Sequence, residues 1–276
     1  MISPSETRKV VGPMAQKLSK SNQSIEKVLF IIEIMANESG PMRLQDIAER
    51  AGIPASTTLR LVNTLLRHGY AHQDAYSQRY HLSLKFMQIG NKIHNQISLR
   101  GIARPFLLEL AQRCQEASCL AVDHNMEVVY TDVVEGPDNM LKIMQHIGKR
   151  APMHCTGVGK LMLLNYNEEK LDNFIQSKGL PVLTPYTKVT KAALLADLEN
   201  CREQDYALDD EECEIGARCV AGPIRDYTGK IIAAISVSGP TSRLTLERTP
   251  AIIAVVKEIA ARISQQMAFE ERPPKD

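Results

Sequence analysis

The sequence has no tryptophan, and only 5% of its 276 residues are aromatic. No apolar run approaches the roughly 18–20 residues of a membrane-spanning helix, and the first residues, MISPSETRKV, lack the apolar core of a secretory signal. The six cysteines form no CxxC pair and no zinc-ribbon spacing, so a disulfide framework is not expected. These absences argue against a membrane or secreted protein and favour a reducing cytoplasm.

The chain is long enough for two domains, and its charge is divided unevenly along its length. Residues 1–100 contain 13 lysines and arginines against 7 acidic residues, whereas residues 101–276 contain 20 against 25. The overall composition, 24% charged and 44% hydrophobic, is that of an ordinary soluble globular protein. A basic N-terminal third joined to an acidic remainder suits a polyanion-binding module attached to a domain of another kind.

The stretch 43–70 predicts two short helices joined by a sharp turn, after a first helix that Ser24 is expected to cap. Apolar residues recur at helical spacing over 44–51, and Gly52 accepts the left-handed conformation that ends a helix. Pro54 suits the first turn of the next helix. The residues that this helix is expected to bury are Leu59, Val62, Leu65 and Leu66. The pattern indicates a helix-turn-helix; an ordinary helical hairpin with a solvated polar face is the alternative.

The polar face of the second helix is predicted to contact DNA. We expect Arg60 and Asn63 to contact bases in the major groove, because a guanidinium suits guanine and an amide suits adenine. The predicted phosphate contacts are Ser56, Thr57, Thr58 and Arg67. Two extended runs around residues 73–78 predict the hairpin of a winged helix-turn-helix, where Arg79 is a further candidate DNA contact unless the hairpin is merely solvated.

Strands, helices and hairpins mix from about residue 102 onward, which predicts an α+β sheet domain. Its expected elements include a helix from Pro105 and a strand over 141–147. The predicted division of the chain is a flexible basic arm at 1–22, a winged helix-turn-helix domain at 23–83, a linker helix at 84–101, the sheet domain at 102–268 and a tail at 269–276.

Two short patterns in the sheet domain predict a ligand site. Alternation along IIAAISVSG places Ser236 and Ser238 on one face of a strand, where two hydroxyls can hold a ligand or simply bond to a neighbouring loop. The segment TGVGK at 156–160 opens a helix, whose first N–H groups attract a carboxylate. It does not match the GxxxxGK[ST] spacing of a phosphate-binding loop. Met144 and Met153 are candidates for an adaptable apolar wall, although core packing explains each as well.

The winged helix-turn-helix, the linker helix and three segments together resemble the IclR family of bacterial transcriptional regulators. The segments are PMHCTGVGKLML (152–163), DDEECEIGARCVAGPIRD (209–226) and IIAAISVSGP (231–240), and the likeness covers about residues 22–268. The resemblance implies a GAF-like effector-binding domain and a homodimer or dimer of dimers. It also implies that a bound small acid is surrounded by Gly157, Val158, Asp209, Cys219, Ser236 and Ser238.

The sequence therefore predicts a cytoplasmic DNA-binding transcriptional regulator, with repression the favoured outcome. Its expected partners are double-stranded operator DNA and a small organic acid or sugar acid, and no cofactor, resident metal or membrane is expected. One alternative is an enzyme that uses Cys219, His154 and Asp209 as nucleophile, base and orienting group. A helix-turn-helix that binds only proteins, and scattered zinc ligands at some of Cys219, His146, His154 and Asp209, are further alternatives.

Overall fold

The computed structural model describes residues 22–96, 98–137 and 145–269, and it divides into two compact units, Met1–Gln96 and Ile97–Asp276. The predicted basic arm and the C-terminal tail lie almost wholly outside the described residues. Each unit is described below by itself. None of the helices in the described ranges has the length and apolar character needed to cross a bilayer.

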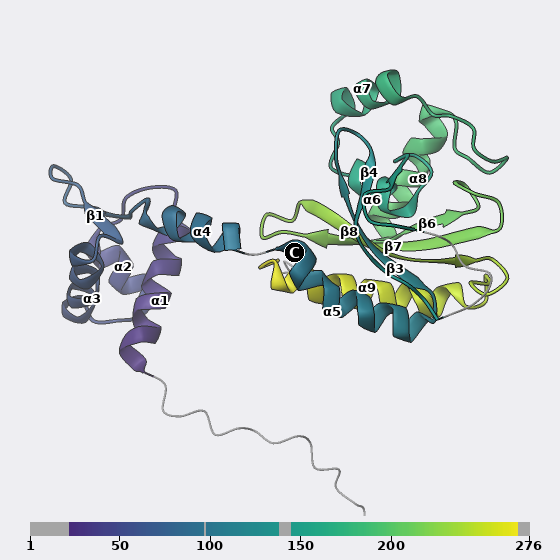
Figure 1. Ribbon diagram of the computed structural model, residues 1–276. Helices are drawn as coiled ribbons and strands as arrows, with labels where there is room; N and C mark the ends of the chain where they lie inside the picture. The colour runs from purple at the N-terminus through teal and green to yellow at the C-terminus, as the bar shows by residue number, and fades with distance from the viewer. Residues whose placement is uncertain (1–21, 97, 138–144, 270–276) are drawn as a thin grey trace, which may run out of the picture. The chain divides into compact units, whose positions relative to one another are not determined.

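The N-terminal unit is a three-helix cluster followed by a small hairpin and a further helix (Figure 1). Its elements are α1 (Gln23–Ala36), α2 (Leu44–Ala51), α3 (Ala55–Arg67), β1 (Ala71–Gln73), β2 (Tyr80–Leu82) and α4 (Lys85–Gln96). The strands β1 and β2 pair antiparallel and form the predicted wing. The first turn of α4 packs on this unit, since the Phe86 ring lies 5.2 Å from the Tyr70 ring.

The N-terminal unit differs from the prediction in two details, one in its core and one at the start of α1. Leu59 is 38% exposed, and Leu61 is buried in its place beside Val62 and Leu65. Leu59 lies three residues before Val62 and Leu61 lies four residues before Leu65, so both fit an approximate helical spacing and spacing alone selected the wrong one. The predicted cap of α1 is also wrong, because Asn22 is the N-cap and its side chain accepts a hydrogen bond from the Ser24 backbone N–H.

The C-terminal unit is built on one six-stranded antiparallel sheet in the order β5-β4-β3-β8-β7-β6. Its strands are β3 (Ala117–Asp123), β4 (Val128–Val134), β5 (Arg150–Ala151), β6 (Ala207–Asp210), β7 (Ala217–Arg225) and β8 (Ile231–Pro240). The helices are α5 (Leu99–Cys114), α6 (Gly157–Leu163), α7 (Glu168–Lys178), α8 (Lys191–Gln204) and α9 (Thr249–Gln266).

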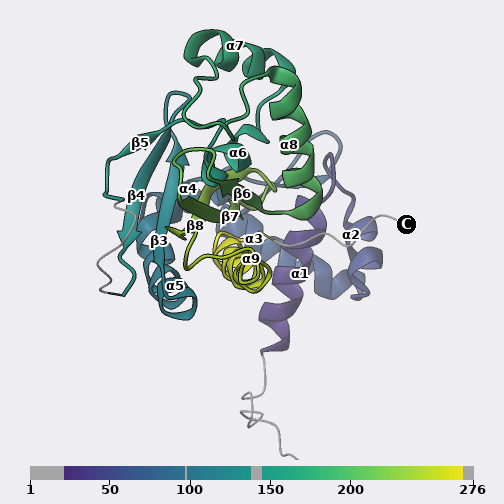
Figure 2. The same cartoon turned by 90° about the vertical axis from the view of Figure 1, so that its right-hand side faces the viewer.

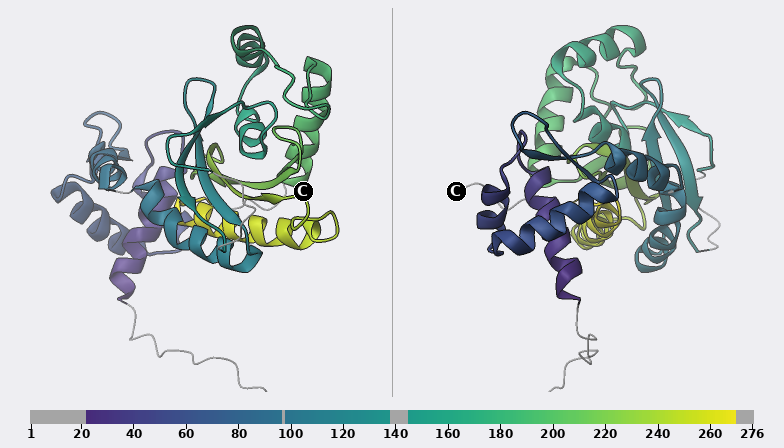
Figure 3. Two further views of the ribbon diagram at one scale, coloured as in Figure 1. Left: turned by 45° about the vertical axis from the view of Figure 1, so that its right-hand side comes forward. Right: turned by 90° about the vertical axis from the view of Figure 1, so that its left-hand side faces the viewer.

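Helices cover both faces of this sheet. α5 and α9 lie along one face, and α6, α7 and α8 lie on the other, with the sheet curling around α6 (Figures 2 and 3). The alternation of β8 divides its side chains between the two cores: Ile235 and Val237 pack on the α5/α9 side, whereas Ala234 packs on the α6 side. Ser236 and Ser238, two and four residues after Ala234, therefore face α6.

Two predicted boundaries in this unit are changed. α5 begins at Leu99 rather than at Pro105, because Ser98 caps it by accepting a hydrogen bond from the Gly101 N–H. The predicted strand at 141–147 falls partly outside the described residues; its described part, 145–147, is not a strand, and the edge strand that pairs with β4 is β5.

Candidate DNA-binding face and ligand pocket

The turn between α2 and α3 has the geometry that the sequence predicted. Gly52 has a φ of 62°, and its N–H bonds to the carbonyls of Ala48 and Glu49, which ends α2. On α3, the residues with exposed side chains include Ser56, Arg60, Asn63 and Arg67. The polar face of α3 is thus presented to solvent, opposite the core that Val62 and Leu65 enter.

Thr58 does not belong to this face. Its side chain is fully buried, and its hydroxyl lies 3.2 Å from the carbonyl oxygen of Pro54 and 3.4 Å from that of Ile53. A hydroxyl held inside the unit cannot reach a phosphate, so the predicted phosphate contact by this side chain is wrong. Arg79 is half-buried in the wing, where its Nη1 donates to the Pro41 carbonyl at 3.4 Å.

In the C-terminal unit, strand register places three of the predicted ligand-binding residues side by side. Asp209 on β6 pairs with Cys219 on β7, and Cys219 pairs with Ser238 on β8. We call Asp209, Cys219 and Ser238 the polar row. All three line a cavity of about 130 Å³, together with Thr156, Tyr130 and Arg150 among other residues.

The start of α6 lies against the polar row because glycines remove side chains there. A Cβ atom at Gly157 would lie 3.6 Å from the Cys219 Sγ and 3.1 Å from the Ala221 Cβ. A Cβ atom at Gly159 would lie 2.4 Å from the Cα of Met153. The two glycines of TGVGK therefore permit close approach of the α6 backbone to its surroundings.

The other predicted residues of the site have different environments. Ser236 is 1% exposed; burial raises the pKa of Cys219, and side-chain hydrogen bonding by Ser238 and Ser236 lowers it in opposition to burial. The side chain of Val158 lies in the apolar core on the α6 side of the sheet, so only its backbone N–H remains a candidate ligand contact. Met153 is fully buried and lines a different cavity, and Met144 lies outside the described residues.

Asp209 is held in a largely buried position. One carboxylate oxygen, Oδ1, accepts hydrogen bonds from the backbone N–H groups of Glu212 at 2.9 Å and Cys213 at 3.2 Å. Burial nevertheless raises the pKa of Asp209 to about 7, because removal from water disfavours the charged form more than these hydrogen bonds favour it. Near neutral pH this carboxyl can therefore accept or donate a hydrogen bond.

Cys219 and His154 do not form a nucleophile–base pair. Burial, followed by the nearby Asp209 carboxylate, raises the pKa of Cys219 to about 12, so the sulfur is a protonated thiol at neutral pH. His154 lines the neighbouring cavity, and its Nε2 lies 3.1 Å from the Pro181 carbonyl oxygen. The enzyme alternative needs His154 beside Cys219, and this arrangement is not the one observed.

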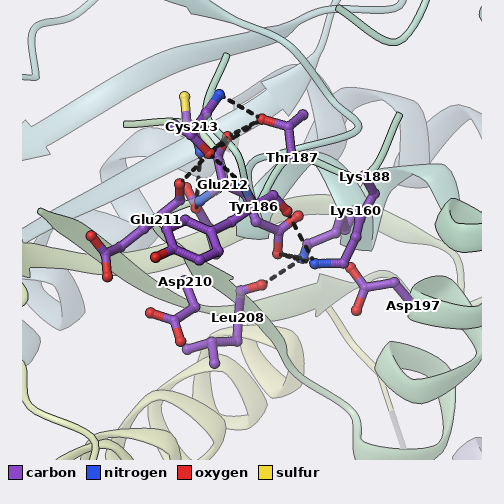
Figure 4. Close-up of polar contacts among 12 residues, drawn as sticks. Lys160, Tyr186, Thr187, Lys188, Asp197, Leu208, Asp210, Glu211, Glu212 and Cys213 are labelled. Carbon is purple, nitrogen blue, oxygen red and sulfur yellow. Dashed lines mark hydrogen bonds and ion pairs between the residues drawn. The ribbon is translucent and has the colours of Figure 1, made fainter. Parts of the chain in front are cut away.

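A buried ion network supports the loop that follows Asp209 (Figure 4). Lys160 on α6 is fully buried, and its Nζ donates to Asp197 Oδ2 at 2.7 Å, Glu212 Oε1 at 2.8 Å and the Leu208 carbonyl at 2.5 Å. Thr187 adds a further anchor by donating its hydroxyl hydrogen to the Glu212 carbonyl at 2.7 Å. The loop between β6 and β7 is therefore fixed by Lys160 of α6 and by Thr187 in the segment before α8.

The residues of this region that were not predicted from the sequence include Tyr130, Arg150 and Lys160. Tyr130 and Arg150 reach the cavity through the pairing of β4 with β5, which no local pattern reveals. Lys160 did carry a signal, since a lysine inside the otherwise apolar helix GVGKLML requires buried partners.

Comparisons with known proteins give a consistent result. The family model described as "Bacterial transcriptional regulator IclR C-terminal" matches residues 91–265, and the "IclR helix-turn-helix domain" model matches residues 24–75. The HTH-type transcriptional repressor AllR of Escherichia coli strain K12 is 34% identical over 262 residues, which cover 95% of each chain. The HTH-type transcriptional regulator XynR of the same strain is 33% identical over 222 residues, which cover 80% of this chain and 88% of that protein.

The fold is shared with solved structures as well. The crystal structure of the Thermotoga maritima IclR protein aligns with a TM-score of 0.59 and 28% sequence identity, covering 90% of this chain and 99% of that one. Together these matches confirm the predicted fold class, an N-terminal helix-turn-helix domain and a C-terminal α+β effector domain.

The raised pKa of Asp209 predicts a dependence of stability on pH that Asp209→Asn removes. The carboxyl ionises near its ordinary pKa of about 3.9 in the unfolded chain, but at about pH 7 in the folded protein. The associated stability is complete below about pH 4 and is lost as the pH rises through about 7. Asparagine keeps the accepting oxygen without the charge. In urea unfolding, the free energy of unfolding of D209N minus that of the parent protein should increase by a few kcal/mol between about pH 4 and pH 8. A difference that stays constant with pH would contradict the raised pKa.

Proposed function

The chain belongs to the IclR family of bacterial transcriptional regulators, and on this premise we propose that it is a repressor controlled by a small organic acid bound at the polar row. The matched relatives are transcriptional regulators and not enzymes, and the helix-turn-helix domain makes operator DNA the macromolecular partner. Repression is the activity given in the name of AllR. The observation that carries the proposal is the register that aligns Asp209, Cys219 and Ser238.

In this proposal α3 is the recognition helix. Arg60 and Asn63 contact base edges in the major groove, and Ser56, Thr57 and Arg67 contact phosphates. The exposure of the α3 polar face supports these roles, whereas the burial of Thr58 removes that residue from the set. The regulator acts as a homodimer or a dimer of dimers, so that two recognition helices read a two-fold symmetric operator.

The chemistry of the pocket favours a small, hydroxylated or hydrated acid. The hydroxyl of Ser238 and the thiol of Cys219 offer hydrogen bonds, and Asp209, with a pKa of about 7, can accept a hydrogen bond from a ligand hydroxyl. Arg150 and Arg218 also line the cavity and supply positive charge for a carboxylate, although each is paired with an acidic side chain, Glu127 and Asp210 respectively. A volume of about 130 Å³ restricts the occupant to a few carbon atoms, such as a keto acid or a short sugar acid.

The acid controls operator binding only if it binds one arrangement of the DNA-binding domains more tightly than another. By linkage, operator DNA then changes the affinity for the acid by the same factor. The predicted domain limits, 23–83 for DNA binding and 102–268 for effector binding, separate the two activities along the chain.

Arg60→Ala should weaken operator binding by roughly 1–3 kcal/mol and relax the sequence preference, because it removes a guanidinium that reads base edges. The measurement is fluorescence anisotropy with an operator fragment selected from genomic DNA and with variants of that fragment. Arg202→Ala is the matched control, since Arg202 is an exposed arginine of the other unit that pairs with Glu199. Unchanged affinity and preference in the Arg60 variant would remove Arg60 from base recognition.

Combining Ser238→Ala with Cys219→Ala should abolish the response to the acid while operator binding stays intact. A thermal-shift screen of small keto and sugar acids identifies the responding acid, because a specific ligand raises stability by mass action. Ser118→Ala is the matched control: Ser118 is a buried serine of the same sheet, but its hydroxyl donates to the Leu107 carbonyl on the α5 side. A normal response in the double variant would exclude the polar row as the effector site.

A further inference from the structure

A second cavity lies in the C-terminal unit beside β5. It has a volume of about 200 Å³, and its lining includes Met126, Met153, Phe174, Pro181, Arg150 and Lys178. Met153 and Phe174 are 0% and 1% exposed and form an apolar floor, whereas Arg150 and Lys178 are exposed at the rim. None of the polar row residues lines this cavity, so it is distinct from the proposed effector site.

The rim of this second cavity is positively charged. The carboxylate of Glu127 forms ion pairs with two cations: Arg150 Nη1 lies 2.5 Å from its Oε2, and Lys178 Nζ lies 3.7 Å from its Oε1. His154, at the floor, is nearly fully buried, and burial lowers its pKa, which favours the neutral ring. Two cations against one carboxylate leave the rim suited to a second carboxylate.

Met126 holds an unfavourable backbone conformation at the edge of the cavity. Asn125 and Met126 have φ values of 55° and 62°, and the flanking residues His124 and Glu127 exchange N–H···O bonds of 2.9 and 3.2 Å. This is the pattern of a type I′ turn, which prefers glycine where Met126 stands. A bulky side chain in a left-handed conformation costs free energy, and such costs concentrate at functional sites.

The Met126 side chain has a defined neighbour on the helix that walls the cavity. The Ser177 hydroxyl of α7 lies 3.6 Å from the Met126 sulfur. With Met153 below it, Met126 gives the cavity two polarizable thioethers, which adapt to apolar ligands and make favourable contacts with aromatic rings.

We propose that the second cavity binds a small monocarboxylic acid with an apolar body. The carboxylate contacts Arg150 and Lys178, and the apolar body lies on Met126, Met153 and Phe174. A cavity of about 150 Å³ lined by apolar side chains holds benzene, so this cavity of about 200 Å³ accommodates a ring with a carboxylate at the rim. Benzoate is therefore the probe of choice.

The second cavity selects a different acid from the polar row. Its lining offers thioethers and a phenyl ring rather than hydroxyls, which favours an apolar body over a hydroxylated one. The two cavities share the wall Arg150–Pro152, and Arg150 lines both. A ligand that pairs with Arg150 in one cavity therefore makes this cation less available to a ligand in the other cavity. The proposal for the second cavity does not depend on whether the polar row binds an effector.

The direct test is methyl NMR of the full chain with ¹³C-labelled methionine. The chain has eleven methionines, and Met126→Leu and Met153→Leu identify the two relevant signals. Benzoate should shift both signals through the ring current of the bound phenyl group, and benzamide, which lacks the charge, should bind at least about tenfold more weakly. Absence of a saturable shift at both methyl groups would overturn the proposal.

Two lysine substitutions on α7 distinguish benzoate binding in the second cavity from non-specific attraction of anions to the protein surface. Lys178→Gln should weaken benzoate binding about tenfold or more, since it removes a charge-assisted contact. Lys170→Gln is the matched control on α7, because Lys170 lies outside the cavity, with its Nζ 3.7 Å from the centre of the Tyr166 ring. Equal losses in both lysine variants, or no loss in either, would show that benzoate does not occupy the second cavity.

Met126→Gly provides an independent readout. Glycine suits the turn, so the midpoint of thermal unfolding should not fall, whereas benzoate affinity should fall because one apolar wall is removed. Benzoate binding at the affinity of the parent protein in this variant would overturn the proposal.

Discussion

The buried ammonium of Lys160 is the constraint on which the effector domain depends. Burial disfavours its charge, yet the carboxylates of Glu212 and Asp197 outweigh that penalty and raise the pKa of Lys160. Because these partners belong to the β6–β7 loop and to α8, the cation can be satisfied only when α6, α8 and the loop are correctly assembled. The loop in turn supplies the N–H groups that hold Asp209 at the edge of the pocket. A single buried charge thus links the packing of the helices to the geometry of the polar row.

The two neighbouring cavities differ in the polar and apolar groups that line them. At the polar row, burial brings the pKa of Asp209 to about 7, so the same carboxyl can meet either a donor or an acceptor. Across the shared wall, thioethers and a phenyl ring face a rim in which two cations share Glu127. Under the two proposals both cavities bind a carboxylate, and the uncharged remainder of the ligand selects the cavity. Such selection by the uncharged part of a molecule is how a small domain distinguishes acids of similar charge.

Local features of the fold were predictable from the sequence, and long-range ones were not. Gly52, Pro54 and the spacing of polar residues on α3 specified the helix-turn-helix, because turns and helix faces are local. The error between Leu59 and Leu61, and the burial of Thr58, arose because nearby residues of a short helix fit similar spacings and tertiary packing decides which of them is buried. The candidate effector residues were inferred from a resemblance to a family to which the chain does belong, but their alignment in space required the register of three strands. Asp197 and Glu212 likewise lie far along the sequence from Lys160 and meet it only in the folded domain.

The measurement that most directly tests whether Lys160 organises this domain is a double-mutant cycle of Lys160→Met and Glu212→Gln, with free energies of unfolding taken from urea titration of the full chain. Lys160→Met should destabilise the protein by about 3–5 kcal/mol, because it leaves the buried Glu212 carboxylate with only the more distant Lys188 ammonium, at 3.6 Å. Adding Glu212→Gln should restore part of that loss, which gives a coupling energy within the range of about 0.5–3 kcal/mol expected for residues in one network. Additive effects of the two substitutions would contradict a domain organised around this buried ion network.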